Sequence, residues 1–454
     1  MYESLNNHRD FFGGDRIGLN PTARIQLGDN TLVDLSYEYA NHDRFVDRGI
    51  PTGRDGRPVD ELNEIVFGDP ELNFADLKAH LLRGNIQHQF TDNLKGVLNT
   101  FYGDYEKVYS NFYVSGYDQI NTPGLVTTDG YIDTNNRQNL MISANLIGEF
   151  ETGLVEHTIL FGAEYIDTSS DQDRFNVVWD QTNDDNELFN IMRPLNLTGG
   201  IGINSAGNTT RANFTTDLND FTQAQVNVLS LYIQDEIKLT NWLHAVVGGR
   251  FDSFDIEVLN VPADELRSRK DNELSPRGGL IIKPVSDLSL YASYSESFLP
   301  RSGEQFANIN GSNNALDPDN FKNIEAGVKW DFADGMSVTS AIFEIKQSSP
   351  QPNDGDPSTL DVVNSKVQGF EVQLEGEVIP GWVLAASYSY LDGEQVGRQG
   401  ASGLRPRELP KSTFSIWNRV QVTGRLGLGL GVTYQDESFV NSTNSAILPG
   451  YARV

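Results

Sequence analysis

Apolar and polar residues alternate one by one through most of this chain. In residues 369–378, Phe370 and Leu374 fall on one face of an extended strand, whereas Glu371 and Glu375 fall on the other. The same alternation recurs in residues 31–39, 140–150, 159–165, 287–295, 414–421 and 426–435. Strands with one apolar and one polar face are typical of antiparallel sheets. Because no long window keeps a helical period, the pattern predicts an all-β protein.

Two kinds of connection alternate between these segments. Eight are short and rich in Asn, Asp and Gly, which supply the positive φ angles of hairpin turns. They occupy residues 28–30, 91–93, 151–153, 240–242, 285–287, 333–335, 379–381 and 422–424. The long, polar ones occupy residues 48–74, 110–137, 169–222, 300–320 and 348–363. This alternation predicts an up-and-down array of about sixteen strands, with short turns at one end and long loops at the other.

The length of the segments distinguishes a membrane barrel from a soluble sheet. Most segments have ten or more residues, whereas soluble strands usually have about 5–6 and a transmembrane strand needs about 9–11. Aromatic residues gather near the segment ends, as in the girdles of outer-membrane barrels. They include Tyr37, Tyr39, Phe101, Tyr102, Trp330, Phe332, Trp382, Tyr388, Tyr390 and Trp417. We therefore predict a transmembrane antiparallel β-barrel.

This prediction fixes the orientation of the strand faces. The apolar face of Phe370, Val372 and Leu374 should point outward to lipid, and the face of Glu371, Gln373 and Glu375 should point inward. A soluble propeller or sandwich array is the alternative, because the later short turns recur at about 45 residues, close to the period of a propeller blade. Propeller blades contain four short strands, however, whereas each repeat here contains two long ones.

Composition removes several classes of function. The chain has 34 Lys and Arg against 63 Asp and Glu, a net charge of −29, and no Cys. This charge argues against nucleic acid as a partner, and the absence of Cys excludes disulfides, thiolate metal sites and a thiol nucleophile. The mean hydropathy is −0.40, and no apolar run reaches the roughly 18–20 residues of a membrane-spanning helix. The polar start of the chain lacks the features of a signal peptide, so the protein is either cytoplasmic or an internal fragment of a longer precursor, and the strand pattern favours the fragment.

Catalytic and metal-binding patterns are weak. The six histidines lack metal-ligand spacing; they are His8, His42, His80, His88, His157 and His244. The Gly-rich residues 13–15 and 199–202 do not connect a strand to a helix, as phosphate loops do. The acidic residues 184–187 and 353–356 lack the ligand spacing of a calcium loop. We therefore expect neither an enzyme nor a protein-bound cofactor.

Several motifs resemble one family of outer-membrane proteins. Residues 274–284, "LSPRGGLIIKP", are followed by residues 288–300, "LSLYASYSESFLP". Further matching stretches are residues 323–329, 367–372, 380–382 with 385–390, 405–413 and 448–454. Together they resemble the barrel of TonB-dependent siderophore receptors, the group of the ferrichrome and pyoverdine receptors. The resemblance implies a 22-stranded barrel with an N-terminal plug, which imports ferric siderophores across the outer membrane of a Gram-negative bacterium.

The chain departs from that pattern at both ends. Neither a plug nor a TonB box is visible, so we interpret residues 1–454 as a partial barrel domain. The N-terminal plug domain and the final C-terminal strands should then be absent from this chain. A passive porin-like channel is the main alternative function, because it would use the same barrel without a plug. A soluble secreted β-rich protein is the remote one.

The resemblance also implies a ligand site and a set of partners. Aligning the loops with those of the ferrichrome receptors places Arg48, Tyr113 and Tyr117 nearest the ligand-facing positions. Weaker candidates for ligand binding are Trp179, Phe189 and Arg301. Iron would arrive as a siderophore chelate, without a protein-bound metal. Expected partners are the ferric siderophore, TonB with its inner-membrane complex through the missing N-terminal region, and outer-membrane lipid and lipopolysaccharide, with no nucleic acid.

Overall fold

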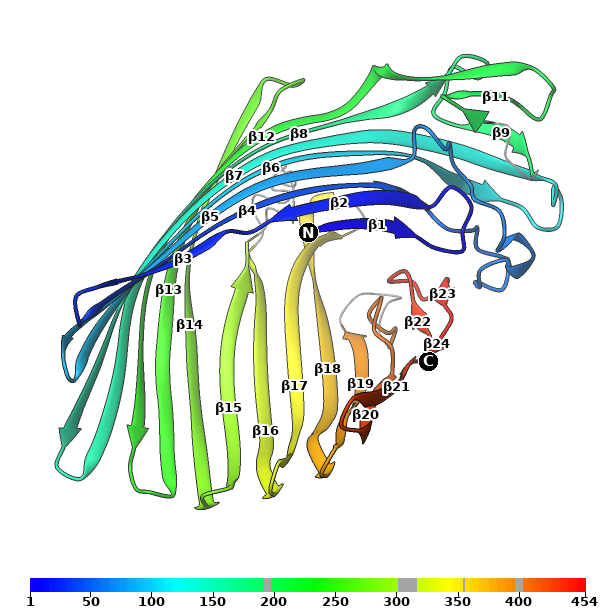
Figure 1. Cartoon of the computed structure of the whole chain (residues 1–454). Coiled ribbons are helices and arrows are strands. Elements are labelled where there is room, and N and C mark those ends of the chain that lie inside the picture. The colour runs from blue at the N-terminus through cyan, green and yellow to red at the C-terminus, as the bar shows by residue number, and fades with distance from the viewer. Residues whose placement is uncertain (192–196, 301–316, 354–355, 397–402) are drawn as a thin grey trace.

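The protein is built almost entirely of antiparallel strands (Figure 1). The computed structural model describes residues 1–191, 197–300, 317–353, 356–396 and 403–454. Its elements are β1 (Tyr2–Asn6), β2 (Gly13–Leu19), β3 (Thr22–Leu27), β4 (Thr31–Phe45), η1 (Asp60–Leu62), β5 (Phe74–Thr91), β6 (Leu94–Tyr117), β7 (Leu125–Thr152), β8 (Val155–Trp179), β9 (Glu187–Asn190), β10 (Leu197–Thr198), β11 (Ile201–Ile203), β12 (Thr209–Lys238), β13 (Leu243–Asn260), β14 (Glu265–Val285), β15 (Leu288–Leu299), β16 (Asp319–Ala333), β17 (Met336–Asn353), β18 (Asp356–Ile379), β19 (Trp382–Val396), β20 (Ser412–Thr423), β21 (Leu426–Gln435), β22 (Ser438–Phe439), β23 (Ile447–Leu448) and β24 (Tyr451–Arg453). No helix among the described residues is long and apolar enough to cross a membrane.

Strands that follow one another in the chain lie side by side in one 22-stranded sheet. Consecutive strands pair from β4 through β8. β8 then pairs with β12, and consecutive strands pair again from β12 through β21. β2 and β3 pair with the two halves of β4, on either side of Asn20 and Pro21. Proline has no N–H to donate, which accounts for the break between them. The predicted up-and-down order is confirmed.

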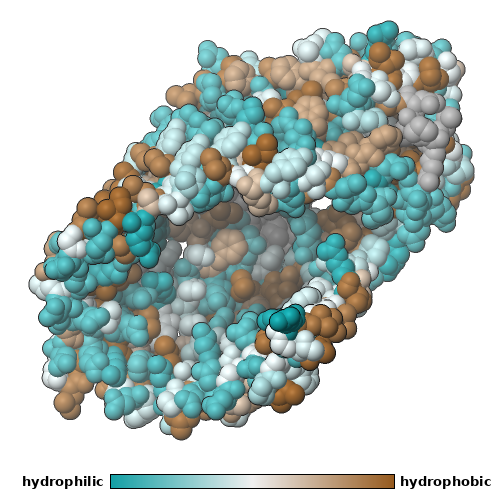
Figure 2. Space-filling model, in the orientation of Figure 1, coloured by the Kyte–Doolittle hydropathy of each residue, from teal (hydrophilic) through white to brown (hydrophobic). Residues whose placement is uncertain are grey.

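Fifteen of the described strands have ten or more residues, close to the predicted sixteen. The sheet curls around a hollow interior, which the space-filling view shows as a deep central opening (Figure 2). Within the part of the chain that the structure describes, β1 pairs only with β2 and β24 only with β21. The curled sheet is therefore open between these two strands.

All eight predicted short turns connect consecutive strands, and they lie along the lower left and bottom of Figure 1. Three of the predicted long loops are wrong over most of their length. β6 and β7 extend to Tyr117 and Leu125, β8 and β12 to Trp179 and Thr209, and β17 and β18 to Asn353 and Asp356. At that same end, only residues 261–264 connect β13 to β14. Where both faces of a hairpin meet water, side chains need not alternate, so periodicity does not detect the strands.

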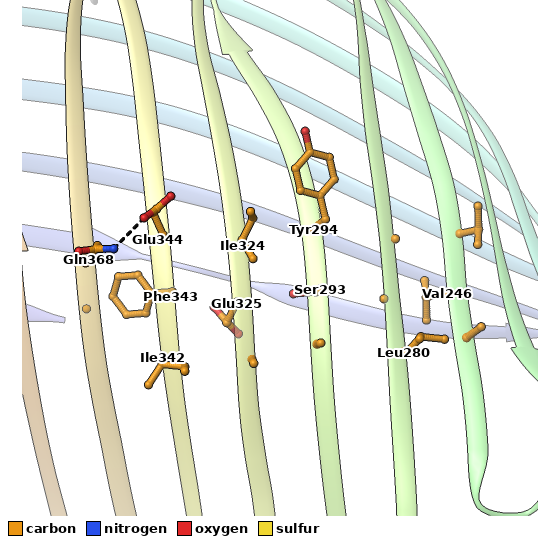
Figure 3. A pocket seen from close by; sticks show the side chains of 17 residues that line it. Val246, Leu280, Ser293, Tyr294, Ile324, Glu325, Ile342, Phe343, Glu344 and Gln368 are labelled. Carbon is orange, nitrogen blue, oxygen red and sulfur yellow. Dashed lines mark hydrogen bonds between the residues drawn. The ribbon is translucent and has the colours of Figure 1, made fainter. Parts of the chain in front are cut away.

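The ladder register separates an apolar face from a polar one across neighbouring strands. Phe370 stands directly opposite Ile342 and Tyr390, whereas Glu371 stands opposite Ala341 and Ser389. Large side chains on the apolar face stay exposed, including Leu82, Leu98, Leu140, Phe161, Leu231, Leu280 and Ile342. In Figure 3 Leu280, Ile324 and Ile342 stand on strands of one wall, with the strands of the opposite wall behind it. The apolar face is thus the outer one, as a membrane barrel requires.

Candidate ligand site

Two residues that the sequence singled out, Arg48 and Tyr113, meet at the long-loop end of the barrel. Arg48 lies in the connection between β4 and β5, and Tyr113 lies near the end of β6. The guanidinium carbon of Arg48 is 5.0 Å from the centroid of the Tyr113 ring. At that distance, a cation over an aromatic face is attracted by the electrons of the ring.

Three more side chains hold the same guanidinium. Nη1 of Arg48 donates hydrogen bonds to the Tyr131 hydroxyl at 2.8 Å, to Oδ1 of Asn111 at 3.1 Å and to the Tyr109 hydroxyl at 3.2 Å. The Tyr131 ring lies 6.0 Å from both the Tyr109 and the Tyr113 rings. We refer to Arg48, Tyr109, Asn111, Tyr113 and Tyr131 as the arginine–tyrosine cluster.

Strand register explains why these residues share a face. Asn111 stands opposite Tyr131, and Tyr109 and Tyr113 lie two residues before and two residues after it on β6. Between Leu94 and Val114 the ladder of β6 has no register shift, so the same face carries Asn99 nearer the short turns. Asn99 belongs to the polar, inward face, where it donates to the Ser143 hydroxyl at 3.2 Å. The arginine–tyrosine cluster therefore faces the interior of the barrel.

A second arginine lies beside the cluster, but its charge is balanced. Arg174 on β8 donates to both carboxylate oxygens of Asp133, at 2.6 and 2.8 Å, and its guanidinium carbon lies 4.3 Å from the Tyr131 ring centroid. Among the described residues, by contrast, every hydrogen-bond partner of Arg48 is neutral. Arg48 is therefore a cation at the long-loop end that can interact with an anionic group in the barrel.

The Tyr113 hydroxyl has a partner of its own. It donates to Oδ2 of Asp129 at 2.8 Å. Burial, together with this hydrogen bond, raises the pKa of Tyr113, which lies well beyond the membrane-spanning part of β6. The ring therefore stays uncharged at neutral pH and presents an amphipathic surface to the interior.

Tyr117, the third leading candidate, does not lie beside Arg48 in the structure. The ladder between β6 and β7 shifts register between Val114 and Gly116, which leaves Ser115 as a bulged residue. Such a bulge moves every following side chain to the opposite face. Tyr117 accordingly packs against the buried loop residues, with its hydroxyl 3.4 Å from the Pro123 carbonyl oxygen.

The weaker candidates Trp179 and Phe189 are buried. Both belong to a cluster of apolar side chains at the loop end, which we refer to as the loop core: Val59, Leu62, Ile65, Phe67, Phe112, Val126, Val177, Trp179, Phe189 and Leu197. Trp179 is 0% exposed and its ring lies 5.3 Å from that of Phe189, which is 4% exposed. Neither side chain is accessible to a ligand, so we leave both out of the proposed site. Arg301 lies outside the described residues.

Sequence reasoning missed Tyr109, Asn111, Tyr131 and Arg174. Tyr109, Asn111 and Tyr113 do follow period two, a signal that was available in the sequence. The prediction of residues 110–137 as a loop conflicts with this signal, because the structure shows strands over most of them. No group of His, Cys, Asp and Glu in the described part of the chain is placed to hold a metal ion. The arginine–tyrosine cluster offers aromatic rings, hydroxyl groups and the Arg48 guanidinium for contact with a ligand.

Comparison with known proteins identifies one family. The family described as TonB dependent receptor-like, beta-barrel, matches residues 18–454. A probable TonB-dependent siderophore receptor, PiuA of Acinetobacter baumannii, is 27% identical over 96% of this chain and 63% of its own length. The metal-pseudopaline receptor CntO of Pseudomonas aeruginosa is 24% identical over 100% of this chain and 63% of its own length.

Solved structures agree with this fold. The crystal structure of the siderophore receptor PiuA from Acinetobacter baumannii superposes with a TM-score of 0.85 and 24% identity, over 99% of this chain and 68% of that one. The ferric preacinetobactin receptor BauA of the same species gives a TM-score of 0.79 and 18% identity, over 99% of this chain and 66% of that one. The chain thus spans less than two thirds of the length of the relatives that it matches in sequence.

Proposed function

This chain belongs to the TonB-dependent receptor-like β-barrel family, and we propose that it forms the barrel of a receptor that imports ferric siderophores. Members of this family are outer-membrane transporters of Gram-negative bacteria, not enzymes. The relative PiuA is a siderophore receptor by name, and the relative BauA is a ferric preacinetobactin receptor by name. The observation in this chain that carries the proposal is the arginine–tyrosine cluster.

The composition of the cluster suits a ferric chelate. Such a ligand presents oxygen atoms, often with negative charge, around a partly apolar shell. Arg48 is exposed, has neutral partners among the described residues, and can donate to those oxygens. The three tyrosine rings offer contact area at a low cost in side-chain entropy. Because each ring is hydrogen-bonded or packed before a ligand arrives, little freedom is lost on binding.

The remaining steps of the transport cycle depend on parts of the receptor outside this chain. We infer that a plug domain accompanies this barrel, because the matched relatives are longer and the family model covers only the barrel. TonB and its inner-membrane complex would act through the N-terminal region outside this chain, and iron would cross as substrate within its chelate. The outer wall would contact membrane lipid and lipopolysaccharide.

The test is the affinity of the receptor for ferric siderophores after substitution of Arg48. Arg48→Ala should weaken binding of the recognised chelate about tenfold or more, or about 1.4 kcal/mol. Ferric hydroxamate and ferric catecholate chelates should be compared, because the cluster does not distinguish between them. Arg83→Ala is the matched control, because Arg83 faces the same interior but is paired with Glu38 at 3.0 Å.

Two outcomes would count against the proposal. Equal affinity of Arg48→Ala and Arg83→Ala would remove the arginine–tyrosine cluster from the site. If the wild-type receptor bound no ferric chelate and passed small solutes without TonB, the passive porin-like channel would be favoured instead.

A further inference from the structure

A second pocket with a cation and aromatic rings lies on the interior wall formed by β12 to β15. Its volume is about 520 Å³, within the range of small-molecule sites. Arg277 stands opposite Gly248 and Ser295, three residues from the outward-facing Leu280, so its side chain faces the interior. We refer to this hollow as the Arg277 pocket; its lining includes Tyr232, Phe254, Ser275, Arg277, Ser295 and Phe298.

The pocket forms where β14 and β15 separate. Pro276 has no N–H to donate, and the ladder between the two strands ends beside it, at the pair Arg277–Ser295. Beyond this point β14 pairs only with β13 and β15 only with β16, within the part of the chain that the structure describes. Phe298 reaches the inward-facing Phe254 across the separation, with the ring centroids 5.3 Å apart. The two rings give the pocket an apolar wall.

Arg277 is the unpaired cation of this pocket. Its side chain is exposed and forms no hydrogen bond or ion pair with the described residues. Arg250, the other arginine of the pocket, is bound by Glu164 at 2.6 Å and by Asp252 at 2.8 Å. The pocket therefore resembles the arginine–tyrosine cluster, because each has one free guanidinium beside aromatic rings.

Hydroxyl groups flank the free guanidinium. Ser275 lies two residues before Arg277 on the same inward face of β14, and Ser295 stands opposite Arg277 on β15. An anionic oxygen placed over Arg277 can therefore accept hydrogen bonds from the guanidinium and from both hydroxyl groups. The pocket suits an anionic, oxygen-rich ligand with a partly apolar surface.

One more carboxylate borders the pocket, but it is engaged elsewhere. Glu296 accepts a hydrogen bond from the Tyr294 hydroxyl and lies 3.4 Å from Lys322. Both partners belong to the outer face of the sheet. The charge of Glu296 is therefore balanced on the side away from the interior.

The pocket lies at the level of the membrane. On the outer face of β16, Trp330 lies near the short turns, where an aromatic girdle is expected, and Lys322 is the first charged residue beyond it. Eight residues separate the two, about 26 Å at 3.3 Å per residue, which matches an apolar band about 25 Å tall. Ser295 stands opposite Asn323, the neighbour of Lys322. The Arg277 pocket is therefore level with the long-loop edge of the apolar band.

The arginine–tyrosine cluster lies further from the membrane. On the outer face of β6, Tyr102 is followed by Asp104, the first charged residue beyond the apolar positions. Asn111 lies seven residues beyond Asp104, about 23 Å along the strand. A chelate bound at the arginine–tyrosine cluster therefore has to pass the level of the Arg277 pocket on its way inward.

We propose that the Arg277 pocket is a second binding site for the ferric chelate, which the chelate occupies after it leaves the arginine–tyrosine cluster. Arg277 and the two serines bind its anionic oxygens, and the rings of Phe254 and Phe298 contact its apolar part. The proposal rests on the proposed function, because it takes the same ligand. It assigns capture of the chelate to Arg48 and its passage through the barrel to Arg277.

The test separates these two steps in the full-length receptor. The probes are a ferric trihydroxamate and a ferric tricatecholate with radioactive iron, and the one that the wild type binds is used throughout. Arg277→Gln should lower the maximal rate of TonB-dependent uptake by cells about tenfold and leave the affinity of the purified receptor unchanged. Arg83→Ala is the matched control, because Arg83 faces the same interior but is paired with Glu38. It should change neither quantity.

Two further variants separate charge and space from folding. Arg277→Lys keeps the cation and should restore most of the uptake rate. Ser295→Phe fills the hollow while Arg277 remains, and it should slow uptake as Arg277→Gln does. Heat-modifiable gel mobility shows whether each variant is folded.

Three outcomes would overturn the proposal. Uptake by Arg277→Gln at the wild-type rate would show that the chelate does not use the pocket. A loss of affinity equal to that of Arg48→Ala would make the pocket part of the first site. An equal loss of uptake in Arg277→Lys would show that the position acts through structure. Absence of chelate binding by the wild type would instead remove the proposed function itself, so the two failures are distinguishable.

Discussion

Phe112 and Tyr113 are neighbours on β6, yet their side chains enter two different environments. Phe112 is 0% exposed and packs in the loop core, with its ring 5.4 Å from that of Trp179. Tyr113 points to the other face and lies over the guanidinium of Arg48. At this end of the barrel β6 thus has a closed apolar side and an open polar side. The difference is made by strand alternation alone.

The loop core and the arginine–tyrosine cluster, on the two sides of β6, have different roles. The loop core buries large side chains from the connections before β5 and before β12, and so fixes those loops on the sheet. Asp69 strengthens this link, because its carboxylate accepts the backbone N–H of Gly200 at 2.7 Å. The arginine–tyrosine cluster buries less and keeps its polar groups within reach of the interior. We infer that the loop core holds the strands in place and the arginine–tyrosine cluster recognises the ligand.

The largest effect is expected in the loop core. Trp179→Ala should cost about 3–5 kcal/mol of local stability, because it leaves a cavity among fully buried rings. Hydrogen exchange of residues 180–191 and 197–212, and protease cleavage within them, should both rise. Trp179→Phe is the milder control, because it keeps a ring and removes an indole N–H that has no hydrogen-bond partner among the described residues. Unchanged exchange in Trp179→Ala would refute the structural role of the core.

The same contrast between an apolar and a polar strand face continues in the membrane-spanning part of the sheet. There the apolar face contacts lipid instead of the loop core. Phe370 lies on the outer face opposite Ile342, midway between the rows of Trp330 and Lys322, and Glu371 lies on the inner face. Phe370→Arg should cost about 2–4 kcal/mol at this depth, and Glu371→Arg far less. Leu374 is level with Trp330, so Leu374→Arg should cost only about 0–1 kcal/mol. Urea unfolding in lipid vesicles measures all three, and equal losses for Phe370 and Glu371 would contradict the assignment of faces.

This contrast also explains how much the sequence could predict. The membrane wall was read correctly because lipid on one side and water on the other force apolar and polar residues to alternate. Beyond the membrane both faces of the hairpins meet protein or water, and the alternation fades. Residues 110–137 and 169–222 are therefore predicted as loops, and the sequence pattern does not single out Tyr131 and Arg174. Nothing in the residue type of Ser115 indicates a bulge, so the position of Tyr117 could not be predicted.

A smaller effect, confined to binding, is expected from the arginine–tyrosine cluster. Tyr113→Ala should weaken ferric-siderophore affinity by about 1–3 kcal/mol, as the loss of an aromatic anchor typically does. The stability of the loops should change little, because Tyr113 lies outside the loop core. Titration of the ferric chelate and hydrogen exchange should be measured on the same variant. A loss of loop protection equal to that of Trp179→Ala would show that the two sides of β6 are not independent.

The smallest effect is expected at Tyr117. The bulge at Ser115 turns this side chain away from Arg48, contrary to the sequence-based prediction. Its hydroxyl makes one long contact, at 3.4 Å, with a carbonyl in its own turn, and its ring packs against the loop core. Tyr117→Phe should therefore change loop stability by less than about 0.5 kcal/mol, within the range of substitutions away from strong contacts. Ferric-siderophore affinity should equal that of the wild type, whereas Tyr113→Phe breaks the bond to Asp129 at 2.8 Å on the interior side. If Tyr117→Phe weakened binding as much as Tyr113→Phe, the Tyr117 hydroxyl would have to reach the ligand. The register shift at Ser115 would then not set the boundary between the two faces.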